Sequence, residues 1–169
     1  YGFLSKGWKP VYVNEFHKNT ARSYEGIHKH KVDTTDIRSV SIEDIPDATV
    51  IIGGPPCQSF SLVGKRIEDD PRGDLVGRFV EIVLQKKPKA FIMENVPGIL
   101  SSKVNGRRLI EIVEEQFENA GYFVDRTKPI ATDYGVPQLR KRVILIGVRK
   151  DIEIKPSEVY SGIIKTHYN

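Results

Sequence analysis

Cysteine is nearly absent from this chain, whose 169 residues include a single one, Cys57. A lone cysteine excludes an internal disulfide and a cysteine-rich zinc site, so we expect no metal in this protein. The lack of disulfides suits a reducing compartment, and we expect the protein in the cytoplasm. Apolar runs long enough to span a membrane and a signal-peptide pattern are also missing, so the sequence predicts no membrane partner.

The composition is otherwise that of an ordinary folded protein. Hydrophobic residues make up 39% and charged residues 28% of the chain, which is long enough for one compact domain with a sizeable core. The net charge of +4 is compatible with a nucleic-acid partner, but so mild an excess does not by itself indicate one.

Short apolar runs alternate with amphipathic segments along the chain. We expect strands at 9–16 (ending near Asn14), 48–54, 89–95 and 142–149, and helices at 17–27, 74–85 and 105–120. Gly121 is a suitable residue for ending the last helix. The strand at 48–54 is apolar enough to be buried on both faces. This alternation predicts an α/β fold in which a mostly parallel sheet carries helices on both faces.

Polar residues gather directly after three of these strands. The clusters occupy residues 14–16, 53–61 and 94–96. Because parallel α/β sheets bind their ligands at the carboxyl ends of the strands, we expect the three clusters to converge on one cleft.

Cys57 follows the second of these strands, in the segment GGPPCQSFS. It fits two interpretations: a free thiol is often a small buried hydrophobe, and a thiol on a rigid turn at a strand end is a suitable nucleophile. Gly53 and Gly54 allow a sharp turn or a close approach to a ligand, while Pro55 and Pro56 stiffen the loop. Polar residues follow the thiol, which is unlike a core environment, and the residues alone leave the two interpretations evenly balanced.

Glu94 and a row of polar and basic residues are further candidates. Glu94 is either a solvated carboxylate at a strand end or the acid that accompanies a nucleophilic Cys57. Gln138, Arg140 and Arg142 alternate just before and within the last strand, so their side chains would share one face. They fit a solvated edge strand, but Arg142 leads into an apolar run. We therefore expect Arg142 to be partly buried against an anionic or carbonyl partner.

The segments GGPPCQSFS, MENV and QLRKR resemble, in their order and spacing, three motifs of the cytosine-C5 DNA methyltransferases. GKRIEDDPRGDL resembles the segment after that family's catalytic loop, and VNEF and DTTDI resemble its cofactor-binding segments. The resemblance extends from Tyr1 to Arg149. It implies the Rossmann-like fold of the S-adenosylmethionine-dependent methyltransferases, with double-stranded DNA as the substrate.

The resemblance also implies catalytic roles. Cys57 would be the nucleophile that adds to C6 of a cytosine flipped out of the helix. Glu94 would bond N3 and the exocyclic amine of the base and share a proton at N3. Arg142 would contact the base carbonyl, Arg140 would support the same region, and Asn95 would shape the loop around Cys57.

Further residues are implied for the cofactor, S-adenosyl-L-methionine, and for DNA. Glu15 would accept bonds from the ribose hydroxyls, Phe16 would stack on adenine, and Asp36 would bind the adenine amine. On the residues alone, Phe16 also fits a core position and Asp36 a turn. Ile37 would cover the adenine ring, and Pro56 and Leu75 would line the methionine part. The residues implied to contact DNA, or to lie on the loop that closes on it, are Gln58, Ser61, Arg72 and Gln138.

The function implied is that of a DNA (cytosine-5-)-methyltransferase, of the kind found in prokaryotic restriction–modification systems and active at the nucleoid. Enzymes that methylate cytosine C5 in tRNA share these motifs but usually carry threonine at the position of Ser61. A non-catalytic DNA-binding or scaffold module is the alternative from a different class.

The family's glycine-rich cofactor motif and its target recognition domain have no counterpart in this sequence. We therefore expect residues 1–150 to be a partial catalytic domain, and residues 151–169 to be a linker or the start of the target recognition region. We also expect a longer natural chain or a second subunit, because a sheet without its first strand has an exposed edge.

Overall fold

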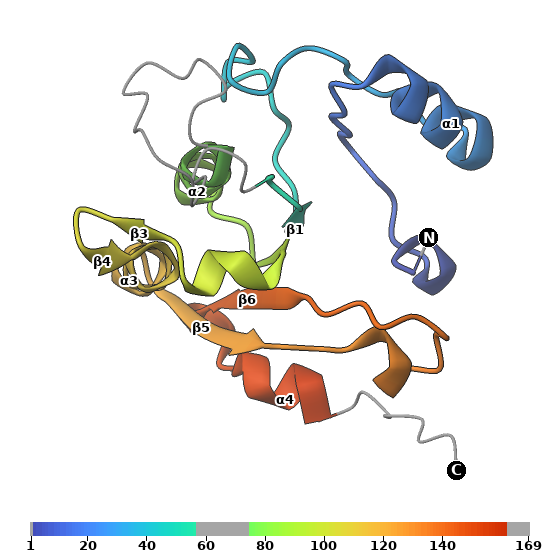
Figure 1. The fold of residues 1–169 in the computed structure, drawn as a ribbon. Coiled ribbons are helices and arrows are strands. Elements are labelled where there is room, and N and C mark those ends of the chain that lie inside the picture. The colour runs from blue at the N-terminus through green and yellow to red at the C-terminus, as the bar shows by residue number, and fades with distance from the viewer. Residues whose placement is uncertain (1, 57–74, 162–169) are drawn as a thin grey trace. The chain divides into compact units, whose positions relative to one another are not determined.

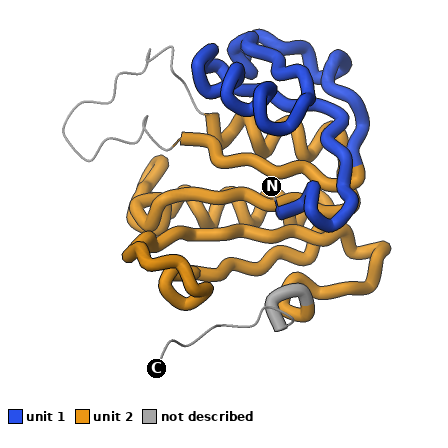
Figure 2. Tube along the Cα trace, turned by 90° about the vertical axis from the view of Figure 1, so that its right-hand side faces the viewer, with its two compact units in different colours: residues 1–48 blue, residues 49–169 orange. Residues whose placement is uncertain are grey.

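The computed structural model describes residues 2–56 and 75–161 of the chain. The chain divides into two compact units, residues 1–48 and residues 49–169, which Figure 2 colours separately. Each unit is described by itself. In the described ranges, no helix combines the length and the apolar character that crossing a membrane requires.

The first unit is small and contains two helices. These are the 3-10 helix η1, Leu4–Lys6, and the α-helix α1, Lys18–His28, which confirms the helix predicted at 17–27. Its buried hydrophobic side chains come from α1 and from the chain that follows: Ala21, Val32, Ile42 and Ile45. Glu25 on α1 accepts a hydrogen bond from the backbone N–H of Val32 (2.8 Å), which ties the helix to the segment after it.

The strand predicted at 9–16 is wrong. The segment forms only one isolated parallel bridge, between Asn14 and Asp33. Its bonds run from the Asp33 N–H to the Val13 carbonyl (2.8 Å) and from the Glu15 N–H to the Asp33 carbonyl (3.0 Å). The ladder does not continue because the Thr35 N–H is donated to the Asp33 side chain instead (2.9 Å).

The second unit is built on a four-stranded sheet in the order β1-β2-β6-β5. The strands are β1, Val50–Gly53; β2, Ala90–Asn95; β5, Tyr122–Thr127; and β6, Val143–Arg149. The strands predicted at 48–54, 89–95 and 142–149 are confirmed, whereas β5 was not predicted. β1 and β2 are parallel, but β6 runs antiparallel to both β2 and β5. The α/β class is therefore confirmed. The sheet is mixed: β1, β2 and β5 run in one direction and β6 in the other, because a loop rather than a crossover helix joins β5 to β6.

Two helices cover one face of this sheet. They are α2, Leu75–Lys86, and α3, Leu109–Asn119, and their apolar stripes meet Phe91, Met93 and Leu145 in one core. A third helix, α4, Pro156–Ser161, lies on the side of β5 and β6 away from α2 and α3 (Figure 1). Helices on both faces were predicted, and the second unit has them.

Short elements connect these layers. They are η2, Pro97–Leu100; β3, Lys103–Val104; β4, Arg107–Arg108; η3, Ala131–Asp133; and η4, Lys150–Ile152. The helix predicted at 105–120 begins only at Leu109, because Asn105 and Gly106 both have positive φ (50° and 82°) and form the turn of the β3–β4 hairpin. Gly121 ends this helix with a φ of 91°, as predicted.

The predicted burial of β1 on both faces is also wrong. Ile52 is 53% exposed, and its register partner Ile92 is half-buried on the same face of the sheet. On that face α4 covers β5 and β6, so the outer strand β1 receives little cover from the helices of this unit.

Gly147 gives a direct test of the core packing. A Cβ at this position on β6 would overlap the ring of Phe91, its partner on β2, while a Cβ on Gly98 would touch nothing closer than 4.0 Å. We expect Gly147→Ala to destabilise the protein by about 2 kcal/mol or more, because overpacking a core forces side chains off their rotamers. Chemical denaturation of this variant beside the Gly98→Ala control measures the difference. Equal midpoints for the two variants would contradict the packing described here.

Candidate functional site

Three chain segments meet at one edge of the sheet in the second unit. β1 and β2 run parallel with Gly53 opposite Met93, so both strands end at this edge. β6 runs antiparallel to β2 with Val143 opposite Asn95, so β6 begins there. The loop after β1, the polar end of β2 and the segment before β6 are therefore neighbours. This arrangement confirms the predicted convergence for the described residues of two clusters, 53–56 and 94–96.

Glu94 and Arg142 form an ion pair at this edge. The Arg142 Nε donates to Glu94 Oε1 at 2.6 Å, across the antiparallel β2–β6 pairing. The Arg142 side chain is 22% exposed and that of Glu94 40% exposed, so the pair is partly desolvated but open to a ligand. The expectation that Arg142 is partly buried with an anionic or carbonyl partner is confirmed on both counts, because its Nη1 also donates to the Lys141 carbonyl (2.7 Å).

Within the described residues, these bonds leave one nitrogen of the guanidinium and one oxygen of the carboxylate without a partner. Among the described residues, Arg142 Nη2 and Glu94 Oε2 form no hydrogen bond with the protein. Glu94 Oε2 lies beside Gly54, where an added Cβ would be only 3.3 Å from the oxygen. The glycine therefore keeps the carboxylate uncovered, and the fixed guanidinium holds its orientation. An oriented acceptor beside an oriented donor can bind the edge of a small polar ring.

Asn95 fastens the loop after β1 to the end of β2. Its side chain is 4% exposed, its Nδ2 donates to the Pro55 carbonyl (2.9 Å), and its Oδ1 accepts the N–H of Val96 (2.9 Å). Two consecutive prolines have no N–H to offer, so the loop is held through a carbonyl. Pro55 lies two residues before Cys57 in the sequence. The predicted role of Asn95 in shaping the loop around Cys57 stays a prediction, because Cys57 lies outside the described residues.

Gln138 and Arg140 do not join this pair. Both are exposed in the loop that precedes β6, where the Arg140 N–H donates to the Gln138 carbonyl (2.8 Å). Such a tight turn breaks the two-residue alternation of a strand, so the predicted common face of Gln138, Arg140 and Arg142 is wrong. Within the described ranges, neither side chain bonds to Glu94.

The first unit holds the predicted cofactor residues. Glu15 Oε1 accepts the N–H of His17, the residue before α1 (2.8 Å), while its Oε2 has no partner in the described part of the chain. Phe16 is 60% exposed, so the interpretation of Phe16 as a core residue is wrong and its ring is free to stack on a ligand. An exposed aromatic ring beside a carboxylate fits a nucleoside, whose base stacks and whose ribose hydroxyls donate.

Asp36 is bound by Arg38. The Arg38 Nε and backbone N–H both donate to Asp36 Oδ1 (2.9 and 3.0 Å), and Arg38 Nη2 pairs with Oδ2. These bonds from Arg38 lower the pKa of Asp36 to about 2. The carboxylate is therefore ionised at neutral pH, and its remaining lone pairs can accept from an amine. Ile37 is half-buried beside it.

Asp33 is the residue that the sequence analysis missed. Its Oδ2 accepts the Tyr12 hydroxyl (2.7 Å), and its Oδ1 accepts the Thr35 N–H. Asn14 Nδ2 donates to the carbonyls of Asp33 (3.2 Å) and Thr35 (2.8 Å). Burial and the neighbouring Asp33 raise the pKa of Tyr12 to about 12, and the Tyr12 and Thr35 bonds lower the pKa of Asp33. This network holds the segment of Glu15 against the turn at Asp36. In the sequence, the spacing of the two aspartates in VDTTD was the only signal of the network.

The other candidates are less informative. Pro56 is exposed at the end of the described loop, and Leu75 is half-buried as the first residue of α2. Four predicted site residues lie outside the described residues: Cys57, Gln58, Ser61 and Arg72. Over the ranges that the structure describes, no three His, Cys, Asp or Glu side chains gather in a way that could hold a metal ion.

The sheet, its helices and the polar edge define an α/β domain of the Rossmann-like methyltransferase class. A family model described as C-5 cytosine-specific DNA methylase matches residues 1–169, and the chain belongs to this family. The resemblance inferred from the sequence motifs is thereby confirmed.

Bacterial and archaeal relatives agree with this assignment. The Type II methyltransferase M.FnuDI of Fusobacterium nucleatum is 42% identical over 158 residues, which cover 93% of this chain and 45% of that protein. M.MthTI of Methanothermobacter thermautotrophicus is 40% identical, over 91% of this chain and 46% of that protein. The chain thus spans about half the length of these relatives.

Solved structures share the fold. A putative DNA modification methyltransferase encoded within a prophage of E. coli superposes with a TM-score of 0.79 at 25% identity, over 99% of this chain and 47% of that one. The Dnmt2 methyltransferase of S. pombe superposes with a TM-score of 0.76 at 19% identity, over 95% and 50% of the two chains. The Rossmann-like fold predicted for the chain is confirmed.

The Asp36–Arg38 contact predicts a pH dependence. The Asp36 pKa is lower in the folded protein, about 2, than the ordinary value of 3.8. Ionised Asp36 therefore stabilises the fold above about pH 4, and this contribution is lost as the pH falls towards 2. NMR titration of the carboxyl carbon should give a midpoint near 2. In Asp36→Asn, the stability difference from the wild type should vanish over the same range. A midpoint near 3.8 would contradict the contact.

Proposed function

We propose that the protein carrying this chain is a DNA (cytosine-5-)-methyltransferase that transfers a methyl group from S-adenosylmethionine to C5 of a cytosine in double-stranded DNA. The observation that carries the proposal is the edge at which Glu94 and Arg142 leave one acceptor and one donor free beside the loop that leads to Cys57. The names of the relatives, Type II methyltransferases, support a role in restriction–modification.

Cys57 is the nucleophile in this proposal. C5 of cytosine is a poor nucleophile, and addition of a thiolate at C6 turns the ring into an enamine that is reactive at C5. After C5 has gained the methyl group, loss of the C5 proton and elimination of the thiolate restore the aromatic ring and free Cys57. The base must leave the duplex for this attack. The role rests on the sequence motif, and the bond from Asn95 to Pro55 supports it by holding the start of the loop at the edge where Glu94 lies.

Glu94 and Arg142 bind the ring in the proposal. Glu94 Oε2 accepts from the exocyclic amine, and the carboxyl group holds a proton at N3, which offsets the charge that develops as the thiolate adds. Arg142 Nη2 donates to the base carbonyl, while Nε keeps Glu94 oriented. Because both groups are fixed before the base arrives, little reorganisation is needed during the reaction.

The adenosine part of the cofactor is held by residues of the first unit in this proposal. S-adenosylmethionine supplies the methyl group. The free Oε2 of Glu15 accepts from the ribose, Phe16 stacks on adenine, Asp36 shares its carboxylate between Arg38 and the adenine amine, and Ile37 covers the ring. On the family resemblance alone, Pro56 and Leu75 would line the methionine side.

Other parts of the proposal rest on the family resemblance. Gln58, Ser61, Arg72 and Gln138 contact the DNA or the loop that closes on it, and Arg140 supports the base-binding region. Residues 1–150 act as a partial catalytic domain, and residues 151–169 lead towards a target recognition region on the same chain or on a second subunit. The enzyme works in the cytoplasm, at the nucleoid.

Substitution of the thiol tests the reaction itself. We expect Cys57→Ser to abolish transfer of labelled methyl groups to duplex DNA, because serine is not ionised at neutral pH, while the thermal unfolding midpoint stays unchanged. The full-length protein is incubated with labelled S-adenosylmethionine and either duplex DNA or tRNA.

The outcomes separate the alternatives. Turnover that survives in Cys57→Ser would refute the nucleophile. Transfer by the wild type to tRNA alone would reject DNA as the substrate, and a wild type that neither transfers methyl groups nor binds the cofactor would be a scaffold module.

Gly54 tests the exposed carboxylate. We expect Gly54→Ala to lower kcat roughly tenfold or more, because its Cβ would crowd Glu94 Oε2, and Glu94→Gln to lower kcat ~10²–10⁴-fold. If both substitutions act through the same oxygen, Glu94 Oε2, the double variant should be no slower than Glu94→Gln alone. Single-turnover rates measure this, with Gly98→Ala as the control. If the rate losses of the two substitutions add in the double variant, Gly54 acts through a group other than Glu94.

A further inference from the structure

The loop between β5 and β6, residues 128–142, is closed and internally bonded. Ile130 and Lys141 form an antiparallel bridge. The Ala131 N–H donates to the Arg140 carbonyl (3.0 Å), and the Arg142 N–H donates to the Pro129 carbonyl (3.1 Å). These bonds join the two sides of the loop at its base, so the residues at its tip are held in place.

Two successive tight turns display a leucine in this loop. The Gln138 N–H donates to the Val136 carbonyl (2.7 Å), and the Arg140 N–H donates to the Gln138 carbonyl (2.8 Å). Leu139, the central residue of the second turn, is 84% exposed, and Val136 is 48% exposed. Two exposed apolar side chains thus lie on one loop that is held by its own backbone bonds.

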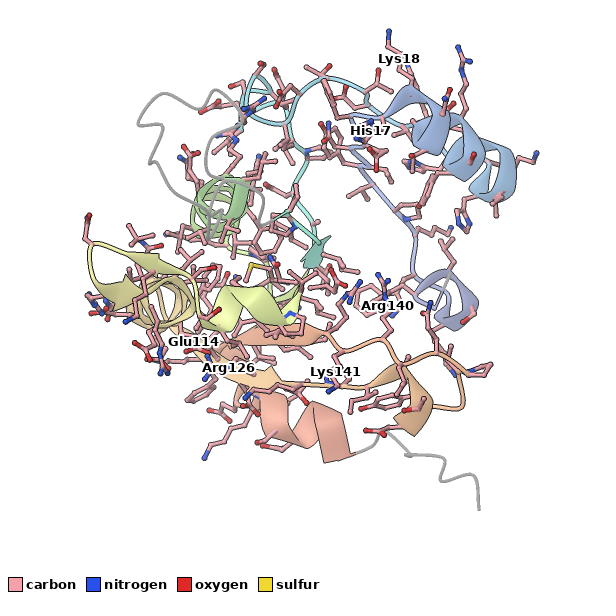
Figure 3. All side chains as sticks on the ribbon, in the orientation of Figure 1. His17, Lys18, Glu114, Arg126, Arg140 and Lys141 are labelled. Carbon is pink, nitrogen blue, oxygen red and sulfur yellow. The ribbon has the colours of Figure 1, made fainter. Side chains whose placement is uncertain are left out.

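The polar residues beside Leu139 indicate what it binds. Arg140 and Lys141, labelled in Figure 3, are exposed, and in the described part of the chain neither forms an ion pair. Among the arginines of this unit that the structure describes, Arg140 is the exception, since the others pair with a carboxylate, as Arg107 does with Glu115, Arg108 with Glu111 and Arg126 with Glu114. Uncompensated cations beside an apolar side chain complement a phosphate backbone, whose sugars and bases also offer apolar surface.

The position of the loop agrees with such a partner. Lys141 precedes Arg142 in the chain, and its carbonyl accepts a bond from the Arg142 guanidinium (2.7 Å), which in turn binds Glu94. The displayed residues thus lead directly into Arg142, which pairs with Glu94 near the end of β2.

We propose that the tip of this loop, residues 136–141, is a docking surface for the DNA strand that carries the target cytosine. Lys141 and Arg140 bind phosphates, and Leu139 packs on the apolar surface of a sugar or base next to the target. This inference rests on the proposed function, since it takes DNA as the substrate.

Salt dependence of DNA binding tests the cationic part. We expect Lys141→Gln to weaken binding of a duplex oligonucleotide roughly fivefold to tenfold at about 0.1 M salt, and to reduce the slope of log K against log salt by about 0.9, the value for one lost phosphate contact. Lys89→Gln is the matched control: Lys89 is exposed and precedes β2, at the end of that strand away from Glu94. It should change neither quantity.

Leu139→Ala tests the apolar part. Its affinity for DNA should fall about fivefold with the salt slope unchanged, because the lost contact carries no charge. Both variants should keep the wild-type thermal unfolding midpoint, since the altered side chains are exposed.

Failure of this inference is distinguishable from failure of the proposed function. If the wild type methylates DNA but both variants bind DNA like the wild type, the loop does not contact DNA and only this inference falls. If Leu139→Ala changes the oligomeric state or the unfolding midpoint while DNA binding is kept, the loop docks protein and the inference is overturned. A wild type that binds no DNA overturns both proposals.

Discussion

The opposite direction of β6 relative to β2 is the constraint on which the site depends. Parallel β1 and β2 bring two strand ends to one edge of the sheet, and a strand of the same direction would begin at the far edge. Because β6 is reversed, its first residues arrive where β2 ends, and Arg142 reaches Glu94 across the pairing. The direction of β6, which the sequence pattern did not predict, is therefore what completes the pair.

Each proposed ligand-binding carboxylate uses part of its hydrogen-bonding capacity for its own placement. Glu94 gives one oxygen to Arg142, Glu15 gives one to the N–H of His17, and Asp36 is bound by Arg38. The cost of orienting these groups is met on folding rather than on binding, which is how a preorganised polar site gains strength. Asn95 does the same for the loop, through the Pro55 carbonyl.

Local patterns in the sequence predicted the elements that depend on local chemistry. The stripes of α1, α2 and most of α3 follow helical periodicity, and the apolar runs of β1, β2 and β6 are strands. The errors have non-local or competing causes. Asp33 takes the Thr35 N–H away from a strand ladder, and an Asn-Gly turn replaces the first turn of α3. Arg142 was predictable as a paired residue, because an arginine leading into an apolar run needs a partner. Its partner, Glu94, lies 48 residues away and depends on the strand order.

The pairing of Glu94 with Arg142 also bears on which bases the site would reject. It presents an acceptor and a donor side by side, and cytosine offers the complement, an amine donor and a carbonyl acceptor. Thymine and uracil carry a carbonyl in place of that amine, so two lone-pair-bearing oxygens would face each other. Discrimination among pyrimidines would then come from repulsion between like dipoles at a rigid edge, with no need for a steric block.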